Sequence, residues 1–146
     1  MNISESRVSE IKKLRQNQGT ILVVDDEPAV CHVTGQMLEL YGYSVLYAEN
    51  GEQAVRLFAE YGDRVTMLVA DIVMATMSGP QLAHHLRRQR PGLPVLFVSG
   101  LVSYANFQGV MGGWMLKKPY TPSLLANKVR DVLTAAEANT VGDSRL

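Results

Sequence analysis

The stretch Val65–Asp71 constrains the fold more than any other part of this chain of 146 residues. It is an apolar run, without polar alternation, that stops at a carboxylate. A run of this kind is typical of a strand that is covered on both faces, as in a parallel sheet. Ligands of open parallel sheets bind beyond the carboxyl ends of the strands. The stretch therefore predicts a buried parallel strand with Asp71 at the ligand-binding edge, although an Asp at such a position also commonly forms a turn.

Apolar segments of the same kind recur along the chain and alternate with segments of helical pattern. Besides Val65–Asp71, the predicted strands are residues 20–25, 43–48, 94–99 and 114–118. Strands that alternate with helices at this spacing require parallel pairing and right-handed crossovers. The chain is therefore predicted to be a single α/β domain with five strands and five helices.

The segments between the strands begin with helix-start signals. These signals are an acid before Pro28, Asn50 with Gln53, Ser78 with Gln81, and Thr121 with Pro122. On the first helix the predicted inner stripe consists of Val30, Val33, Thr34, Met37, Leu38 and Tyr41, a helical spacing. The glycine-rich segment 101–113 is poor helix material and predicts at best a loose fourth helix.

Residues 19–136 are predicted to form the domain, residues 1–18 a polar extension with a thin helical stripe, and residues 137–146 a flexible tail. The extension is either a marginal helix outside the core or a docking or dimerising helix. The lone Cys31 is predicted to be a small core residue.

Charge and hydropathy exclude some classes of protein. Acidic and basic residues number fourteen each, which gives no reason to expect binding to nucleic acid or to an anionic membrane. No apolar run approaches the ~18 residues of a membrane span, and the N-terminus lacks the apolar region of a signal peptide. We therefore expect a soluble cytoplasmic protein.

Polar residues fall where the predicted strands end, at Asp25-Asp26, Asp71, Ser99-Gly100 and Lys118. In a parallel sheet these positions share one edge. Three carboxylates there would raise one another's pKa unless a cation intervened. A hard divalent cation, Mg²⁺ or the similar Mn²⁺, suits such oxygen ligands. One carboxylate could then attack phosphorus while the metal, an ammonium, a hydroxyl and backbone N–H groups stabilise charge on the phosphoryl oxygens.

Each of these residues also has an ordinary structural explanation. An acid before Pro28 caps a helix, a lysine is commonly solvated, and a serine can end a strand in a turn. Their coincidence at strand ends favours one shared site. His32, His84 and His85 lack the spacing of a metal-binding pair, and we expect solvated or partly buried side chains.

The segments around these residues resemble the receiver domain of two-component response regulators over about residues 20–136. The similarity is carried by Ile21–Pro28, Asp71–Gly79, Leu93–Gly100 and Lys117–Tyr120, and it is strongest to receivers attached to hybrid sensor kinases. The resemblance implies a flavodoxin-like, doubly wound sheet with the strand order 2-1-3-4-5.

The resemblance also implies roles for the site residues. Asp71 would accept a phosphoryl group from a phosphohistidine of a sensor histidine kinase or of a histidine phosphotransfer protein. Asp26, Asp71 and the Val73 carbonyl would bind Mg²⁺ directly, and Asp25 would act largely through water. Lys118 would pair with the phosphoryl group and precede a cis peptide bond to Pro119, and the Ser99 hydroxyl and the Gly100 N–H would turn toward the phosphoryl group.

The chain departs from this family's pattern at several positions. Ala75 stands where most relatives have proline, which predicts a looser loop after the acceptor. Met115 stands where a switching Tyr or Phe is usual, and Trp114 lies on the opposite strand face, where we expect packing under a helix. We therefore expect segment 101–113 to reorder on phosphorylation. The apolar Val73 and Leu101 predict slow self-hydrolysis of the acyl phosphate.

The predicted function is a phosphorylation-controlled interaction module that is no enzyme beyond its own phosphorylation and slow dephosphorylation. Output would pass through protein contacts of the fourth helix, fifth strand and fifth helix, without direct nucleic-acid contact, and a homodimer is an open alternative. A phosphorylation-independent adaptor or dimerisation module is the second hypothesis. A phosphatase of the haloacid dehalogenase kind would need an acid in place of Val73, and a flavodoxin would need hydroxyls and glycines after the first strand.

Overall fold

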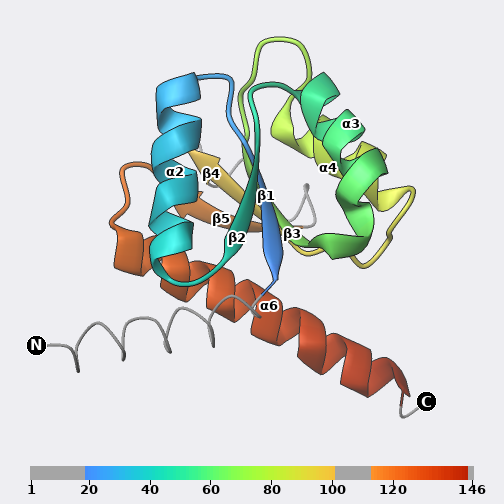
Figure 1. The fold of residues 1–146 in the computed structure, drawn as a ribbon. Helices are drawn as coiled ribbons and strands as arrows, with labels where there is room; N and C mark the ends of the chain where they lie inside the picture. The colour runs from blue at the N-terminus through green and yellow to red at the C-terminus, as the bar shows by residue number, and fades with distance from the viewer. Residues whose placement is uncertain (1–18, 101–112, 145–146) are drawn as a thin grey trace, which may run out of the picture.

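The chain folds around one parallel sheet of five strands, ordered β2-β1-β3-β4-β5 (Figure 1). The computed structural model describes residues 19–100 and 113–144. The strands are β1 Thr20–Val24, β2 Ser44–Ala48, β3 Val65–Asp71, β4 Val95–Ser99 and β5 Trp114–Lys117. All four strand pairs are parallel. The predicted flavodoxin-like order is confirmed, and the predicted strand bounds agree with the observed ones to within one residue.

Four α-helices lie within the described residues: α2 Pro28–Leu40, α3 Gly51–Tyr61, α4 Gly79–Arg87 and α6 Pro122–Ser144. A short 3-10 turn, η2 Gly62–Arg64, links α3 to β3. The expected fourth helix falls in residues 101–113, of which only Gly113 is described, and the expected helical extension 1–18 also lies outside the described residues.

The predicted helix-start signals are largely confirmed. The Asn50 side chain accepts a hydrogen bond from the Gln53 N–H, and Ser78 with Gln81 forms a reciprocal capping box. The Thr121 hydroxyl accepts from the Leu124 N–H at 3.2 Å. Before α2 the cap residue is Glu27, whose side chain makes no capping bond. These bonds supply acceptors for N–H groups that the first turn of a helix leaves without an intrahelical partner.

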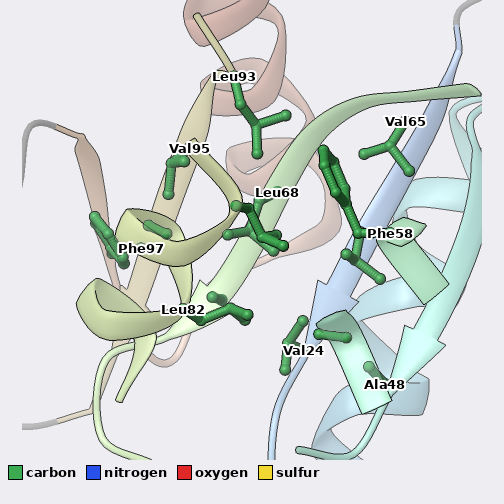
Figure 2. Close-up of a cluster of buried hydrophobic side chains, with 14 of the residues drawn as sticks. Val24, Ala48, Phe58, Val65, Leu68, Leu82, Leu93, Val95 and Phe97 are labelled. Atoms are coloured by element: carbon green, nitrogen blue, oxygen red, sulfur yellow. The ribbon is translucent and has the colours of Figure 1, made fainter. Parts of the chain in front are cut away.

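Helices cover both faces of the sheet (Figure 1). Side chains of β1 alternate between two apolar clusters: Leu22 and Val24 point to the cluster under α3 and α4, whereas Ile21 and Val23 point to the cluster under α2 and α6. Figure 2 shows the first of these clusters. Burial on both sides explains why the three central strands β1, β3 and β4 contain no regular polar positions.

The inner face of α2 differs from the predicted stripe. Cys31, Thr34, Gly35 and Leu38 are buried, whereas Val33 is 48% exposed. A Cβ atom at Gly35 would lie 2.1 Å from the ring of Tyr47, so the ring packs directly on the helix backbone. The predicted stripe is therefore right for Thr34 and Leu38 and wrong for Val33, and it left out Gly35 because a glycine carries no hydrophobic signal. The prediction for Cys31 as a small core residue is confirmed.

Helix α6 extends beyond the predicted domain boundary at residue 136, to Ser144. The prediction of a tail after this boundary is therefore wrong for the backbone of residues 137–144, which is helical. No glycine or proline interrupts the sequence from residue 123 to residue 141, so the helix meets no stop signal there. Among the described helices, none has the length and apolar character to cross a membrane.

Candidate functional site

Three carboxylates converge beyond the carboxyl ends of β1 and β3. Asp25 directly follows β1, Asp71 is the last residue of β3, and these two strands pair side by side. One oxygen from each of Asp25, Asp26 and Asp71 lies within 4.8 Å of the others. Asp25 and Asp71 are buried, and Asp26 is half-buried. The sheet order thus brings Asp71 to two acids that precede it by 45 and 46 residues in the sequence.

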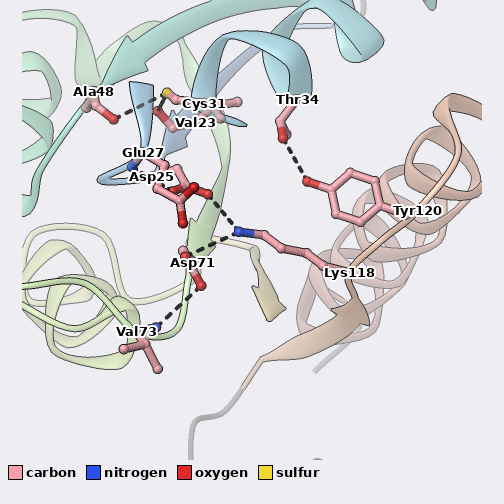
Figure 3. Close-up of polar contacts among 10 residues, drawn as sticks. All are labelled: Val23, Asp25, Glu27, Cys31, Thr34, Ala48, Asp71, Val73, Lys118 and Tyr120. Atoms are coloured by element: carbon pink, nitrogen blue, oxygen red, sulfur yellow. Dashed lines mark hydrogen bonds and ion pairs between the residues drawn. The ribbon is translucent and has the colours of Figure 1, made fainter. Parts of the chain in front are cut away.

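Lys118 reaches this acidic cluster from the residue after β5 (Figure 3). Its Nζ atom lies 2.9 Å from Asp25 Oδ2 and 3.3 Å from Asp71 Oδ2. Its backbone N–H donates to the Ser99 carbonyl at 2.8 Å. A Cβ atom at Gly100 would lie 3.9 Å from the Lys118 side chain. The end of β4 therefore borders the lysine, as the strand order predicts.

The loop after Asp71 is tied to both of the neighbouring carboxylates. The Val73 N–H lies 3.4 Å from Asp71 Oδ1, and the Ala75 N–H donates to Asp26 Oδ2 at 3.0 Å. A proline at position 75 could not make the second bond because it has no N–H. We expected Ala75 to loosen this loop, but in the structure it connects the loop to Asp26.

Burial and neighbouring charges set the protonation of the site. Burial raises the pKa of Asp71; the Lys118 ammonium opposes this rise, and the Asp25 charge adds to it. Burial disfavours the charged form of Lys118, but hydrogen bonds and charge from Asp25, together with Asp71, outweigh it and raise the pKa of Lys118. Lys118 therefore stays an ammonium at neutral pH.

The acidic cluster fits a divalent cation. When Asp25, Asp26 and Asp71 are ionised, their −3 charge against the +1 of Lys118 leaves a net charge of −2. Carboxylate oxygens are the ligands that Mg²⁺ takes in proteins, usually few in number and supplemented by water. A divalent cation would offset the remaining charge, so the residues present are compatible with the predicted metal.

Ser99 and Met115 lie at the border of this site. Ser99 ends β4 and is buried, and Gly100 after it is exposed. Met115 is buried and belongs to the apolar cluster under α3 and α4. Its thioether thus packs inward at the position where the family usually has an aromatic ring.

Trp114 occupies the opposite face of β5, as the strand alternation predicts. Trp114 remains 40% exposed, and the Nζ of Lys128 on α6 lies 5.2 Å from the ring centroid. The expectation that Trp114 packs under a helix is therefore met only in part: the side chain contacts α6 but stays partly exposed. The prediction for the histidines is confirmed, since His32 and His84 are exposed and His85 is half-buried.

The sequence did not predict that two further hydroxyl groups lie near the site. Thr34 on α2 and Tyr120, two residues after Lys118, lie with their hydroxyl oxygens 2.7 Å apart (Figure 3). They are 86 residues apart in the chain, and Thr34 carries no motif of its own. The Lys118-Pro119-Tyr120 sequence gave a signal for the lysine only. The predicted cis peptide between Lys118 and Pro119 is present.

The fold and these strand-end residues together define a signalling module of the two-component class. Residues 21–130 match the response regulator receiver domain family, and the chain belongs to this family. Sensor kinase CckA of Brucella abortus (strain 2308) is 35% identical over 117 residues, which are 78% of this chain and 12% of CckA. The probable transcriptional regulatory protein TcrX of Mycobacterium tuberculosis is 30% identical over 125 residues, 84% of this chain and 53% of TcrX. The chain thus spans about half of one relative and much less of the other.

Solved structures support the same assignment. The receiver domain from the hybrid histidine kinase CckA is 34% identical, with a TM-score of 0.68 over 79% of this chain and 99% of that one. A CheY-like receiver domain protein from Methanospirillum hungatei JF-1 is 28% identical, with a TM-score of 0.73 over 83% of this chain and 98% of that one. The predicted similarity to receivers of hybrid sensor kinases is confirmed.

Proposed function

We propose that Asp71 accepts a phosphoryl group from a phosphohistidine of a sensor histidine kinase or of a histidine phosphotransfer protein, in a reaction that requires Mg²⁺. Membership of the receiver family supports a role in two-component signalling. The observation that carries the proposal is the position of Asp71, whose carboxylate lies within 4.8 Å of oxygens of the other two acids and 3.3 Å from the Lys118 ammonium.

An oxygen of the Asp71 carboxylate attacks phosphorus in this reaction. The new P–O bond forms as the P–N bond of the phosphohistidine breaks. The electron pair of the P–N bond remains on the imidazole, which takes up a proton. The Lys118 ammonium, 3.3 Å from Asp71 Oδ2, pairs with the negative charge of the phosphoryl oxygens. The Ser99 hydroxyl and the Gly100 N–H are the further donors that we assign to these oxygens.

Asp26, Asp71 and the Val73 carbonyl would hold the cation, with Asp25 acting largely through water. Bound there, Mg²⁺ would neutralise charge on the phosphoryl oxygens and on the carboxylates. The Ala75 N–H bond orients the Asp26 carboxylate from the side of the β3–α4 loop. Mn²⁺, which also prefers oxygen ligands, would serve in its place.

The test is incubation of the protein with acetyl phosphate and Mg²⁺, followed by intact-mass analysis and peptide mapping. We expect one added phosphoryl group on the peptide that contains Asp71, and none when Mg²⁺ is removed by EDTA. Asp71→Asn should abolish the modification, whereas Asp63→Asn, a change at an exposed aspartate in η2, should leave it intact. A protein that stays unmodified with acetyl phosphate and with a phosphorylated kinase would support the phosphorylation-independent adaptor instead.

The lifetime of the acyl phosphate is a further part of this proposal. Val73 is 51% exposed and follows the acceptor by two residues, so its side chain is placed to influence attacking water. An apolar residue there cannot orient that water, and we expect slow hydrolysis. Val73→Asn should shorten the lifetime measured by loss of the phosphorylated mass, and an unchanged lifetime would contradict the assignment.

The consequences of phosphorylation for other proteins also belong to the proposal. We expect the modification to change the affinity for a partner protein through reordering of segment 101–113, most of which lies outside the described residues. Amide exchange in that segment, measured with and without acetyl phosphate, is the measurement that checks it. A homodimeric state and a cytoplasmic location stay predictions of the sequence.

A further inference from the structure

The Tyr120–Thr34 contact joins the lysine-bearing loop to a helix on the other side of the site. Thr34 is 4% exposed and lies on the inner face of α2. Tyr120 lies in the connection between β5 and α6, and its ring packs against the cluster under α2 and α6. The hydroxyl oxygens are 2.7 Å apart, the ordinary length of a hydrogen bond between hydroxyl groups. Burial raises the pKa of Tyr120, so the phenol remains protonated and able to donate.

Lys118 lies in a segment that is bonded to the rest of the domain on both sides of this residue. On the N-terminal side its N–H donates to the Ser99 carbonyl at the end of β4. On the C-terminal side the chain passes through Pro119 to Tyr120, whose hydroxyl is bonded to α2. The Lys118 side chain extends from this segment to Asp25, which lies just before the same helix, and to Asp71. The distance from Lys118 to the acids therefore depends on how the 118–120 segment sits against α2.

We propose that Tyr120 and Thr34 are positioning residues, whose hydroxyl bond fixes the 118–120 segment on α2 and so holds the Lys118 ammonium at the phosphoryl position of Asp71. This inference rests on the proposed phosphoryl transfer. Neither hydroxyl contacts the reacting atoms; they act through Lys118. Because catalytic groups lose efficiency steeply when they are displaced, a looser segment would slow transfer even though every reacting residue remained.

The experiment compares full-length wild type with Tyr120→Phe, Thr34→Val and the double variant. The rate of phosphorylation by acetyl phosphate is measured at saturating donor over a range of Mg²⁺ concentrations. Each single variant should lower the maximal rate about three- to tenfold, the range that loss of one buried hydrogen bond allows. The Mg²⁺ concentration at half-maximal rate should not change, because Asp25, Asp26 and Asp71 are untouched. The double variant should be no slower than either single variant, since all three lack the same bond.

Matched controls separate positioning from a general loss of stability. Tyr43→Phe removes a hydroxyl from a second tyrosine of the same cluster, one that is buried whereas Tyr120 is partly buried. Thr66→Val removes a hydroxyl that donates to the Thr20 carbonyl at 3.1 Å, at the opposite end of β3. Thermal unfolding is recorded for every variant, and the controls should keep the wild-type rate whatever their stability. Thr34→Ser retains a hydroxyl and should restore most of the rate lost in Thr34→Val.

The outcomes are distinct. A wild-type rate in folded Tyr120→Phe, or effects of Tyr120→Phe and Thr34→Val that multiply in the double variant, would overturn the positioning role. Equal slowing in Tyr43→Phe and Thr66→Val would also overturn it, because any hydroxyl loss would then suffice. A wild-type protein that is never phosphorylated contradicts the proposed function itself, whereas normal wild-type phosphorylation with unaffected variants contradicts only this inference.

Discussion

The environment of the Asp71 side chain disfavours its charged form. Its carboxyl is largely buried beside Asp25, and the raised pKa of Asp71 reflects chiefly that burial. An acid whose pKa is higher in the folded than in the unfolded state stabilises the fold fully below its unfolded pKa. This contribution is lost as the pH rises through the folded pKa. Where Asp71 is ionised, its buried charge therefore lowers the stability of the fold.

The first prediction concerns this cost. In metal-free buffer at pH 7, Asp71→Asn should raise the melting temperature, because the buried charge and its repulsion by Asp25 are removed. The gain should shrink as the pH falls toward about 4, the ordinary pKa of an aspartate. There the wild-type Asp71 side chain is protonated and therefore neutral, like the asparagine of the variant. Thermal denaturation followed by circular dichroism across this pH range measures it. Asp63→Asn, at an exposed site, should show no such gain, and a lower melting temperature of Asp71→Asn at pH 7 would contradict the prediction.

A second prediction at this scale concerns Gly79, the first residue of α4. A Cβ atom at position 79 would lie 2.3 Å from the Asp71 carbonyl oxygen, so helix α4 begins in direct contact with the backbone of Asp71. Gly79→Ala should lower the free energy of unfolding by about 1–3 kcal/mol, the usual effect of overpacking, and displace Asp71. Urea denaturation measures the first effect, and the phosphorylation rate the second.

Gly92→Ala is the matched control for this change. A Cβ atom at Gly92 would meet no atom within 4 Å, so the same substitution should shift stability by less than about 0.5 kcal/mol. Equal effects at positions 79 and 92 would show that backbone flexibility, rather than contact with Asp71, decides the outcome.

At the scale of helices and strands, the sequence predicted some features and not others. Strands were predictable because burial on both faces leaves an unbroken apolar run, as in Val65–Asp71. The inner face of α2 was predicted for Thr34 and Leu38 but not for Gly35, because the burial of Gly35 depends on Tyr47, which lies in a different element. The extent of α6 was underestimated because helix continuation after residue 136 needs only the absence of a stop signal.

Arg90 illustrates a contact between elements that no local pattern reveals. Arg90 lies three residues after the end of α4. In the structure its guanidinium donates to the carbonyl oxygens of Gly62 and Val65 and lies 5.1 Å from the Phe58 ring centroid. It thus joins the end of α4 to the junction between α3 and β3.

The third prediction follows from this contact. Arg90→Ala should lower the free energy of unfolding by about 1–3 kcal/mol, through lost hydrogen bonds to partly buried carbonyls and a lost cation–π contact. Arg88→Ala, which removes an exposed arginine two residues away, should change it by less than about 0.5 kcal/mol. Urea denaturation of both variants measures the difference, and similar values for the two would refute the role of Arg90.

At the scale of the whole molecule, topology determined how much of the site the sequence could predict. Parallel strands place their carboxyl ends on one edge, so Asp25, Asp71, Ser99 and Lys118 could be grouped before any coordinates were known. The individual bonds could not be predicted. Lys118 is closer to Asp25 than to Asp71, and the Thr34–Tyr120 bond depends on how α2 and the connection after β5 approach each other.

The fourth prediction concerns cooperative unfolding. The Lys118–Asp25 ion pair connects the segment after β5 with the segment after β1, 93 residues apart, and the Thr34–Tyr120 bond lies beside it. We therefore expect the edge strand β5 to unfold together with the rest of the sheet. Fluorescence of Trp114, the sole tryptophan, and far-ultraviolet circular dichroism should give coincident urea transitions. A fluorescence transition at distinctly lower urea concentration would mean that β5 detaches first.

The reach of Lys118 across the sheet has a consequence during synthesis of the protein. A ribosome translates the aspartates at 25, 26 and 71 well before the lysine at 118. A nascent chain without the fifth strand therefore presents the acidic cluster without its ammonium partner. If Asp71 is the phosphoryl acceptor as proposed, we expect a chain that lacks the fifth strand to be a poor acceptor until that late strand emerges from the exit tunnel and docks.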